Sequence, residues 1–242
     1  IATSNPIFLQ LKILDEDSHY YFNIAHNIAS GNGFRHDSFN LTDGVQPLFL
    51  FLIVPIFKFI TDKLLAINAV LLFQSFIGVI YALVLFFTVR LISTRKVARF
   101  ILAIWAISPF FIQTDLNGFE TNIAFLFLSL VTYFYYKYFE RSGWLKKTYF
   151  IYLGLLLGLG ALARIDMLFL VPAVMLSIYF LNRKIINLNR VLLMLGVVSL
   201  VILPWLVYCL LIGKSPIHIG GQSVRFLCSS HPFWATNTVP SY

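Results

Sequence analysis

Six long runs of apolar residues follow one another between residues 64 and 212, and short polar segments separate them. A helix of about 20 residues, at about 1.5 Å per residue, crosses the roughly 30 Å of hydrocarbon in a bilayer. Three runs meet this length, and the other three, at roughly 17 residues each, meet it marginally. We therefore predict an all-α, polytopic bundle of six transmembrane helices, over 64–92, 98–114, 119–137, 148–163, 166–182 and 190–212.

Two shorter helices are predicted in the first 63 residues. The stretch Pro47–Ile60 is apolar, but at roughly 14 residues it is too short to cross, which favours a re-entrant or interfacial helix. Further upstream an amphipathic helix is expected to end at Gly31 and Gly33, because apolar residues recur there at helix spacing: Tyr21, Ile24, Ala25, Ile28 and Ala29. Both helices would belong to an outer loop, residues 1–63, and a second outer segment would be the tail, 213–242.

The composition excludes a soluble domain. The chain is 59% hydrophobic and 12% charged, whereas soluble domains carry about 25% charged residues. The excess apolar surface must face lipid or other helices in the membrane. The net charge of +8 does not predict a nucleic-acid partner, because the basic residues lie in short loops between apolar runs.

Charged residues are distributed unequally between the two sets of loops. Three loops, at 90–99, 137–147 and 183–190, hold eleven basic residues and one acid, and the positive-inside rule predicts that they are cytoplasmic. The opposite, extracytoplasmic face holds nine of the ten acids: Asp15, Glu16, Asp17, Asp37, Asp43, Asp62, Asp115, Glu120 and Asp166. Acids contribute little to orientation, so their segregation indicates function. Among them, Asp37, Asp43 and Asp62 are expected to be ordinary solvated loop residues.

The three consecutive acids Asp15, Glu16 and Asp17 precede the amphipathic helix. Acids at a helix N-terminus complement the helix dipole, which is the simplest explanation. Three in a row exceed what capping requires, and they repel one another. Such a cluster either binds a divalent cation or holds a carboxylate with a raised pKa.

Two tight outer turns also carry charges. Glu120 follows the turn at 115–118 and enters the next span, where an ionised group is costly unless it is paired or faces a wet cavity. Arg164 can hold an anion such as a phosphate, and Asp166 can fix its guanidinium. The alternatives are a first-turn dipole partner for Glu120 and a local ion pair for Arg164. Arg225, which follows a Gly-Gly pair, is a further candidate for a phosphate ligand.

The order of these motifs resembles the membrane-embedded GT-C glycosyltransferases, which include protein O-mannosyltransferases, the aminoarabinose transferase acting on lipid A, and uncharacterised bacterial relatives. The resemblance runs from about Asp15 to Arg225. The segments that carry it are Asp15-Glu16-Asp17, Tyr20-Tyr21-Phe22, Ala25 to Phe34, Asp43-Gly44-Val45-Gln46-Pro47-Leu48, Asn117-Gly118-Phe119-Glu120-Thr121, Leu162-Ala163-Arg164-Ile165-Asp166, Pro204-Trp205 and Gly221-Gln222-Ser223.

The resemblance implies an activity and its partners. It implies a multi-pass protein of the bacterial plasma membrane that transfers a sugar on the extracytoplasmic side. The donor would be a polyprenyl or dolichyl phosphate monosaccharide, and the acceptor a glycan, a lipid or a protein. A divalent cation, Mg or Mn, would assist the departure of the phosphate, and we expect the transfer to invert the anomeric centre.

The resemblance also implies roles for individual residues. Asp17 matches the acid of the first outer loop that acts as base or metal ligand, with Glu16 as the preceding acid of the pair and Asp15 as an extra one. Glu120 matches the second outer-loop acid and is the other candidate metal ligand. The Arg-x-Asp element corresponds to Arg164, a candidate ligand of the donor phosphate, and Asp166, a supporting acid.

The chain departs from the family pattern at both ends. Only about fourteen residues precede Asp15, where relatives have a first span, and no apolar run occurs in 226–242. We therefore expect the sequence to be a fragment.

The alternative functions are a membrane transporter and a non-catalytic, truncated membrane subunit. Transport is disfavoured because an ion pathway needs charges deep within the spans, whereas here the acids crowd the outer turns.

Overall fold

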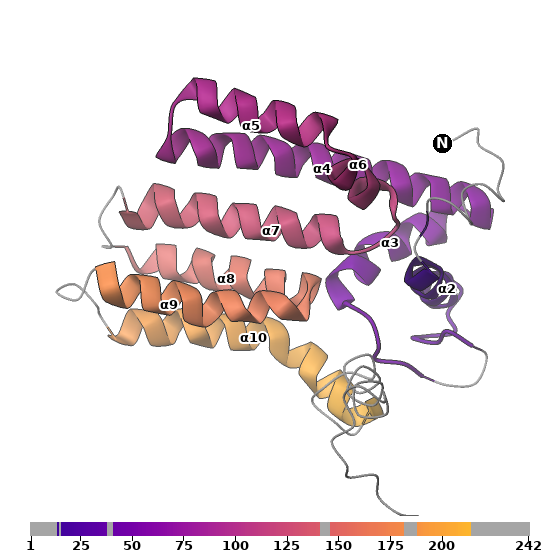
Figure 1. Cartoon of the computed structure of the whole chain (residues 1–242). Coiled ribbons are helices and arrows are strands. Elements are labelled where there is room, and N and C mark those ends of the chain that lie inside the picture. The colour runs from indigo at the N-terminus through magenta and orange to yellow at the C-terminus, as the bar shows by residue number, and fades with distance from the viewer. Residues whose placement is uncertain (1–13, 15, 38–40, 141–145, 182–187, 214–242) are drawn as a thin grey trace, which may run out of the picture.

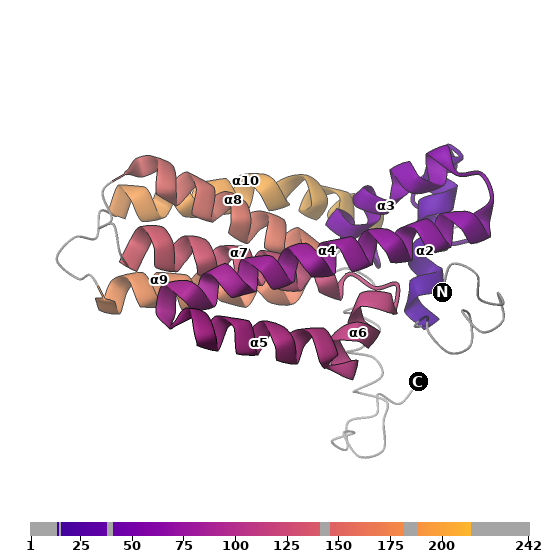
Figure 2. The ribbon, with the colours of Figure 1, turned by 90° about the horizontal axis from the view of Figure 1, so that it is seen from above.

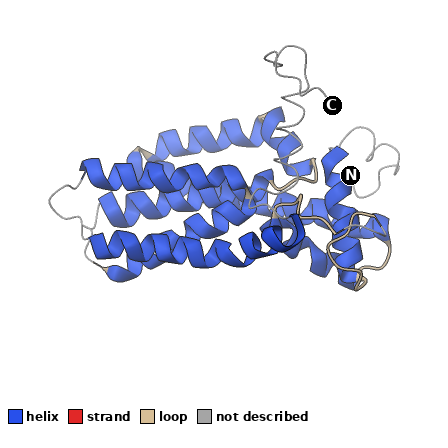
Figure 3. Ribbon diagram, turned by 90° about the horizontal axis from the view of Figure 1, so that it is seen from below, coloured by secondary structure: helices blue, strands red, loops and turns tan. Residues whose placement is uncertain are grey.

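The computed structural model describes residues 14, 16–37, 41–140, 146–181 and 188–213. This part of the chain is helical and contains no β-strand, which confirms the predicted all-α class (Figure 1). Figure 3, which is coloured by secondary structure, shows that the long helices run nearly parallel and that the described loops gather mainly at one end of the bundle. The helices are α2 (Glu16–Ala29), α3 (Pro47–Phe59), α4 (Lys63–Ile92), α5 (Arg95–Ile107), α6 (Pro109–Leu116), α7 (Thr121–Phe134), η2 (Tyr135–Glu140), α8 (Lys147–Ala163), η3 (Ile165–Phe169), α9 (Leu170–Leu181) and α10 (Leu188–Gly213).

Each predicted apolar run coincides with one helix or with two consecutive helices. By length and hydropathy, two helices of the described part could cross a membrane: Lys63–Ile92 and Leu188–Ile212. A third crossing is added if α5 and α6, which meet at an angle of 60°, form one broken span. Pro109 explains the break, because proline lacks an N–H and keeps Ser108 extended. That the chain crosses the membrane six times remains a prediction.

The long helices form one layered bundle, in which α4 packs on α5 and α7, and α8 packs on α7 and α10 (Figure 1). Two glycines of α8 permit its close approach to α10. A Cβ atom added at Gly154 would lie 2.7 Å from the carbonyl oxygen of Met194, and one at Gly158 would lie 2.8 Å from Cβ of Val201. Small residues at such positions let membrane helices pack by direct backbone contact.

The predicted outer-loop helices form a cap at one end of the bundle. Helix α2 lies across this end, at a steep angle to the long helices (Figure 2). Its apolar stripe, with Phe22, Ile24 and Ala25 fully buried, packs on α3, whose buried face includes Phe49 and Ile53. The short apolar helix predicted at Pro47–Ile60 is thus confirmed as α3. Gly213 is the one described residue of the predicted tail 213–242.

Candidate functional site

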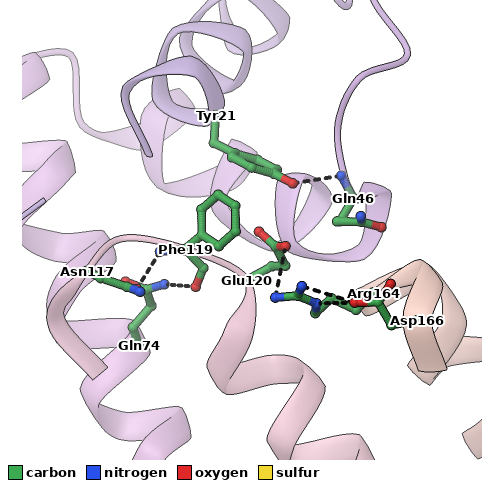
Figure 4. Close-up of polar contacts among 8 residues, drawn as sticks. All are labelled: Tyr21, Gln46, Gln74, Asn117, Phe119, Glu120, Arg164 and Asp166. Atoms are coloured by element: carbon green, nitrogen blue, oxygen red, sulfur yellow. Dashed lines mark hydrogen bonds and ion pairs between the residues drawn. The ribbon is translucent and has the colours of Figure 1, made fainter. Parts of the chain in front are cut away.

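Charged side chains from three elements meet where α2 covers the end of the bundle (Figure 4). Glu120 is the last residue of the turn between α6 and α7, and its side chain is 3% exposed. Arg164 lies in extended conformation (φ −155°, ψ 128°) between α8 and η3, where the helix is interrupted. The interruption directs Arg164 and Asp166 toward the Glu120 turn, although the two segments are far apart in the sequence.

Arg164 connects a buried acid with an exposed one. Its Nε and Nη2 atoms donate to the same oxygen, Oδ2 of Asp166, at 3.1 and 3.0 Å. Its Nη1 atom lies 3.9 Å from Oε1 of Glu120 (Figure 4). Side-chain exposure is 36% for Arg164 and 64% for Asp166. The guanidinium therefore stays accessible from outside while two carboxylates hold it, as a ligand for an incoming anion requires.

Glu120 is poised to exchange a proton near neutral pH. Burial is the main cause that raises its pKa from 4.5 to about 7, and the charge of Asp17 raises it further. The Arg164 charge acts in the opposite direction and offsets part of this increase. The second carboxylate oxygen, Oε2, is buried and has no hydrogen-bond partner among the described residues. Perturbed carboxylates of this kind concentrate at functional sites.

Tyr21 joins α2 to this site. It was not among the site residues that the sequence predicted. Its hydroxyl accepts a hydrogen bond from the backbone N–H of Gln46 at 2.9 Å and lies close to Glu120 (Figure 4). Burial and the charge of Glu120 raise the pKa of Tyr21 well above 10, so the hydroxyl stays protonated. Its ring packs edge-on against Phe119. The helix periodicity indicated only that Tyr21 was buried, because its hydroxyl partner comes from a distant segment.

The turn that carries Glu120 is fixed from two sides. Nε2 of Gln74, a fully buried residue of α4, donates to the carbonyl of Phe119 at 2.6 Å, and Oδ1 of Asn117 accepts from the Phe119 N–H at 3.0 Å. On the other side, the Ser18 hydroxyl of α2 donates to the Asn117 carbonyl. Gln74 could have been suspected from the sequence, since a polar residue within a long apolar run is costly unless it has a partner.

Gly118 allows α2 to contact this turn directly. It has φ +78°, a conformation that residues with a side chain rarely adopt. A Cβ atom at Gly118 would lie 2.9 Å from Cβ of Ser18, so no room exists for a larger residue. The Asn-Gly turn predicted at this position is thereby confirmed, and its glycine also sets the distance between Glu120 and α2.

Of the site residues predicted from the sequence, the structure brings four together, and the side chains of three others lie outside the described part. Asp17 is exposed in the first turn of α2, near enough for its charge to raise the pKa of both Glu120 and Tyr21. Asp17, Glu120, Arg164 and Asp166 thus share one end of the bundle. Glu16 begins α2, but its side chain lies outside the described part, as do the residues Asp15 and Arg225.

Asp43 corrects one expectation, because it is not a solvated loop residue. It is fully buried. The loop before α3 folds between α2 and α10, where the Tyr208 hydroxyl donates to the Thr42 carbonyl at 3.1 Å. The Tyr20 and Thr42 hydroxyls also share a hydrogen bond. Burial of Asp43 follows from these contacts between distant segments, which the local sequence does not reveal.

The described side chains contain no group of three or more His, Cys, Asp or Glu that could hold a metal ion. The carboxylate of Asp17 is nevertheless near enough to act on that of Glu120 through its charge, and Oε2 of Glu120 makes no hydrogen bond within the described part of the chain. Mg²⁺ is commonly bound by one or two carboxylates together with phosphate oxygens of the substrate. The residues therefore fit a cation that arrives with a phosphorylated substrate.

The raised pKa of Glu120 predicts a pH-dependent contribution to stability. Because the folded protein binds this proton more tightly than the unfolded chain, the contribution is complete below about pH 4.5 and is lost as the pH rises through about 7. The difference in unfolding free energy between the wild type and Glu120→Gln should fall by up to about 3 kcal/mol across this range. Thermal or denaturant unfolding in detergent at several pH values measures it.

The control for this prediction is Asp62→Asn. Asp62 is an exposed carboxylate that caps α4 by accepting from the Leu65 N–H at 2.8 Å, and asparagine can keep that bond. Its difference from the wild type gives the effect of removing an exposed carboxylate, against which the Glu120→Gln difference is compared. Parallel stability curves for the wild type and Glu120→Gln would contradict the assignment of the raised pKa to Glu120.

Comparison with known proteins identifies one family. The profile described as dolichyl-phosphate-mannose-protein mannosyltransferase matches residues 45–208, which is more than half of the chain. The matched range includes Glu120, Arg164 and Asp166, and it begins after Asp17. No curated protein and no solved structure matches the chain significantly.

Proposed function

Since the chain belongs to the dolichyl-phosphate-mannose-protein mannosyltransferase family, whose members are membrane glycosyltransferases of the GT-C type, we propose that it transfers a sugar from a lipid-phosphate donor. The donor would be a polyprenyl-phosphate monosaccharide, and the acceptor a glycan, a lipid or a protein. The transfer would take place at the extracytoplasmic face of a bacterial plasma membrane. The observation that carries this proposal is the charged cluster around Arg164, at the end of the bundle that α2 covers.

Arg164 is the proposed ligand of the donor phosphate. Its guanidinium is partly exposed, and the carboxylates of Glu120 and Asp166 fix its orientation. A planar guanidinium can bind two phosphate oxygens at once. The residues after Arg164 continue as η3, where the apolar side chains of Ile165 and Phe169 are exposed. The lipid chain of the donor would lie along these side chains while its phosphate reaches the guanidinium.

Asp17 is the proposed general base. An acceptor hydroxyl would attack the anomeric carbon and form the new C–O bond, while the bond from that carbon to the phosphate oxygen breaks. The phosphate leaves with the bonding electron pair, and Asp17 takes the hydroxyl proton. In an inverting displacement the base and the leaving group lie on opposite faces of the sugar.

A divalent cation, Mg or Mn, would be held by Glu120 together with oxygens of the donor phosphate. Asp17 is the alternative second ligand of this cation, a role that it would take in place of that of the base. Bound there, the cation would neutralise negative charge on the leaving phosphate. Asp166, and Glu16 and Asp15 before the base, would shape the charge around the site, and Arg225 would supply a second contact to the phosphate.

A binding and transport experiment tests the proposed function. Polyprenyl-phosphate mannose should raise the unfolding temperature of the purified protein in detergent, whereas the polyprenyl alcohol, which lacks phosphate and sugar, should leave it unchanged. Other monosaccharides on the same lipid phosphate extend the test to the unknown sugar. The absence of a shift with all of them would contradict the proposal. Flux of the sugar lipid into proteoliposomes, without transfer, would instead identify a transporter.

A further inference from the structure

A long hollow runs along one face of α10 at the end of the bundle opposite the candidate site. This open hollow has a volume of about 770 Å³, and Lys147 of α8 and Arg190 of α10 line the end nearest the start of α10. From there it follows α10 past Leu193 and Gly196 to Leu200. A Cβ atom added at Gly196 would meet nothing within 4 Å, so this glycine leaves the floor of the hollow open.

The hollow faces the surface that α10 presents to a membrane. Helix α10 is one of the two helices that are long and apolar enough to cross a bilayer. Its side chains Leu192 and Leu200 are 54% and 70% exposed, which in a membrane means contact with lipid. From Arg190 to Leu200 the helix rises by about 15 Å, which is about half of the hydrocarbon thickness of a bilayer. The hollow therefore has the length of a single leaflet.

The chemistry of the hollow changes along its length. Two cationic side chains lie at one end of the hollow, Lys147 exposed and Arg190 partly buried, beside the polar Asn189, and the lining residues beyond them are apolar. A phospholipid has the matching arrangement, with a phosphate at one end and acyl chains of leaflet length. Two cations favour a headgroup with a net negative charge over a zwitterionic one.

We propose that this hollow binds one anionic phospholipid, with its phosphate at Lys147 and Arg190 and one acyl chain beside Gly196. The site is independent of sugar transfer, since it lies at the opposite end of the bundle. The loops at this end are those predicted to be cytoplasmic, so the lipid would belong to the cytoplasmic leaflet. The bound lipid would fill the hollow along α10, beside the place where α10 packs closely against α8.

Native mass spectrometry of the purified chain tests the proposal with two lipids of equal acyl chains, dioleoyl phosphatidylglycerol and dioleoyl phosphatidylcholine. Each cation should contribute about fivefold to binding of the anionic lipid, so the wild type should prefer phosphatidylglycerol by about 25-fold. In the double variant Lys147→Ala/Arg190→Ala this preference should disappear. The control Arg95→Ala/Lys96→Ala removes two exposed cations of α5 at the same end of the bundle and should keep the preference (Figure 1).

The variant Gly196→Leu tests the acyl-chain part of the site without a change of charge. A leucine side chain fits the open space and should displace the chain, so phosphatidylglycerol binding should weaken about tenfold. Equal binding of both lipids by the wild type would overturn the proposal, as would an unchanged preference in the double variant or unchanged binding by Gly196→Leu. A dimer that Gly196→Leu dissociates would show that a second copy of the chain occupies the hollow instead.

Discussion

Asp17→Asn should abolish sugar transfer while the protein still folds and binds its donor. The amide has the shape of the carboxylate but cannot take the proton of the acceptor hydroxyl, and positioned bases contribute about 10²- to 10⁴-fold to a rate. Asp17 is exposed in the first turn of α2, and asparagine has nearly the same volume, so the exchange should leave the fold intact. The measurement is kcat for transfer from the lipid-phosphate donor, together with the thermal shift that the donor produces.

Two comparisons sharpen this experiment. Asp62→Asn changes another exposed carboxylate, at the N-terminus of α4, and should keep wild-type kcat. Raising the Mg or Mn concentration separates the two possible roles of Asp17, because excess metal should restore activity if Asp17 is only a metal ligand and should not if it is the base. Wild-type activity in Asp17→Asn would exclude both roles.

Arg164→Ala should have the second large effect, a loss of donor binding. Once the bound donor covers Arg164, removing one partner of the hydrogen-bonded charge pair between guanidinium and phosphate should cost about 2–5 kcal/mol, which corresponds to at least about a thirtyfold weaker affinity for the donor. The change also removes the positive charge that lowers the pKa of Glu120. The pKa of this buried carboxyl should therefore move above 7, and any rate step that needs its ionised form should shift to higher pH. Donor titration by thermal shift measures the affinity, and pH–rate profiles measure the second effect.

Matched variants distinguish phosphate binding from structural support. Arg164→Lys keeps the charge but loses the planar fork, so it should recover part of the affinity at most. Arg99→Ala removes an exposed cation of α5 and should leave donor affinity unchanged. If Arg164→Lys and Arg164→Ala both bind the donor as the wild type does, the phosphate is bound elsewhere.

Local sequence determined the helices and where several of them end. The apolar runs are long enough to specify helices wherever they occur, because an uninterrupted apolar segment in lipid must satisfy its own backbone hydrogen bonds. Gly31 and Gly33, with φ +85° and +77°, follow the end of α2 as predicted. Pro109 divides the second predicted run, 98–114, into α5 and α6. The family resemblance, carried by the order of the motifs, was confirmed over residues 45–208.

Only the tertiary structure decided the environment of each charged group. Glu120 and Asp43 were both counted among the outer acids, yet the structure buries both, because burial depends on segments that pack from far along the chain. Tyr21 and Gln74 reach the Glu120 turn from α2 and α4 for the same reason (Figure 4). The sequence shows where each carboxylate stands in the chain. Its pKa is set by desolvation and by neighbouring charges, and these exist only once the chain has folded.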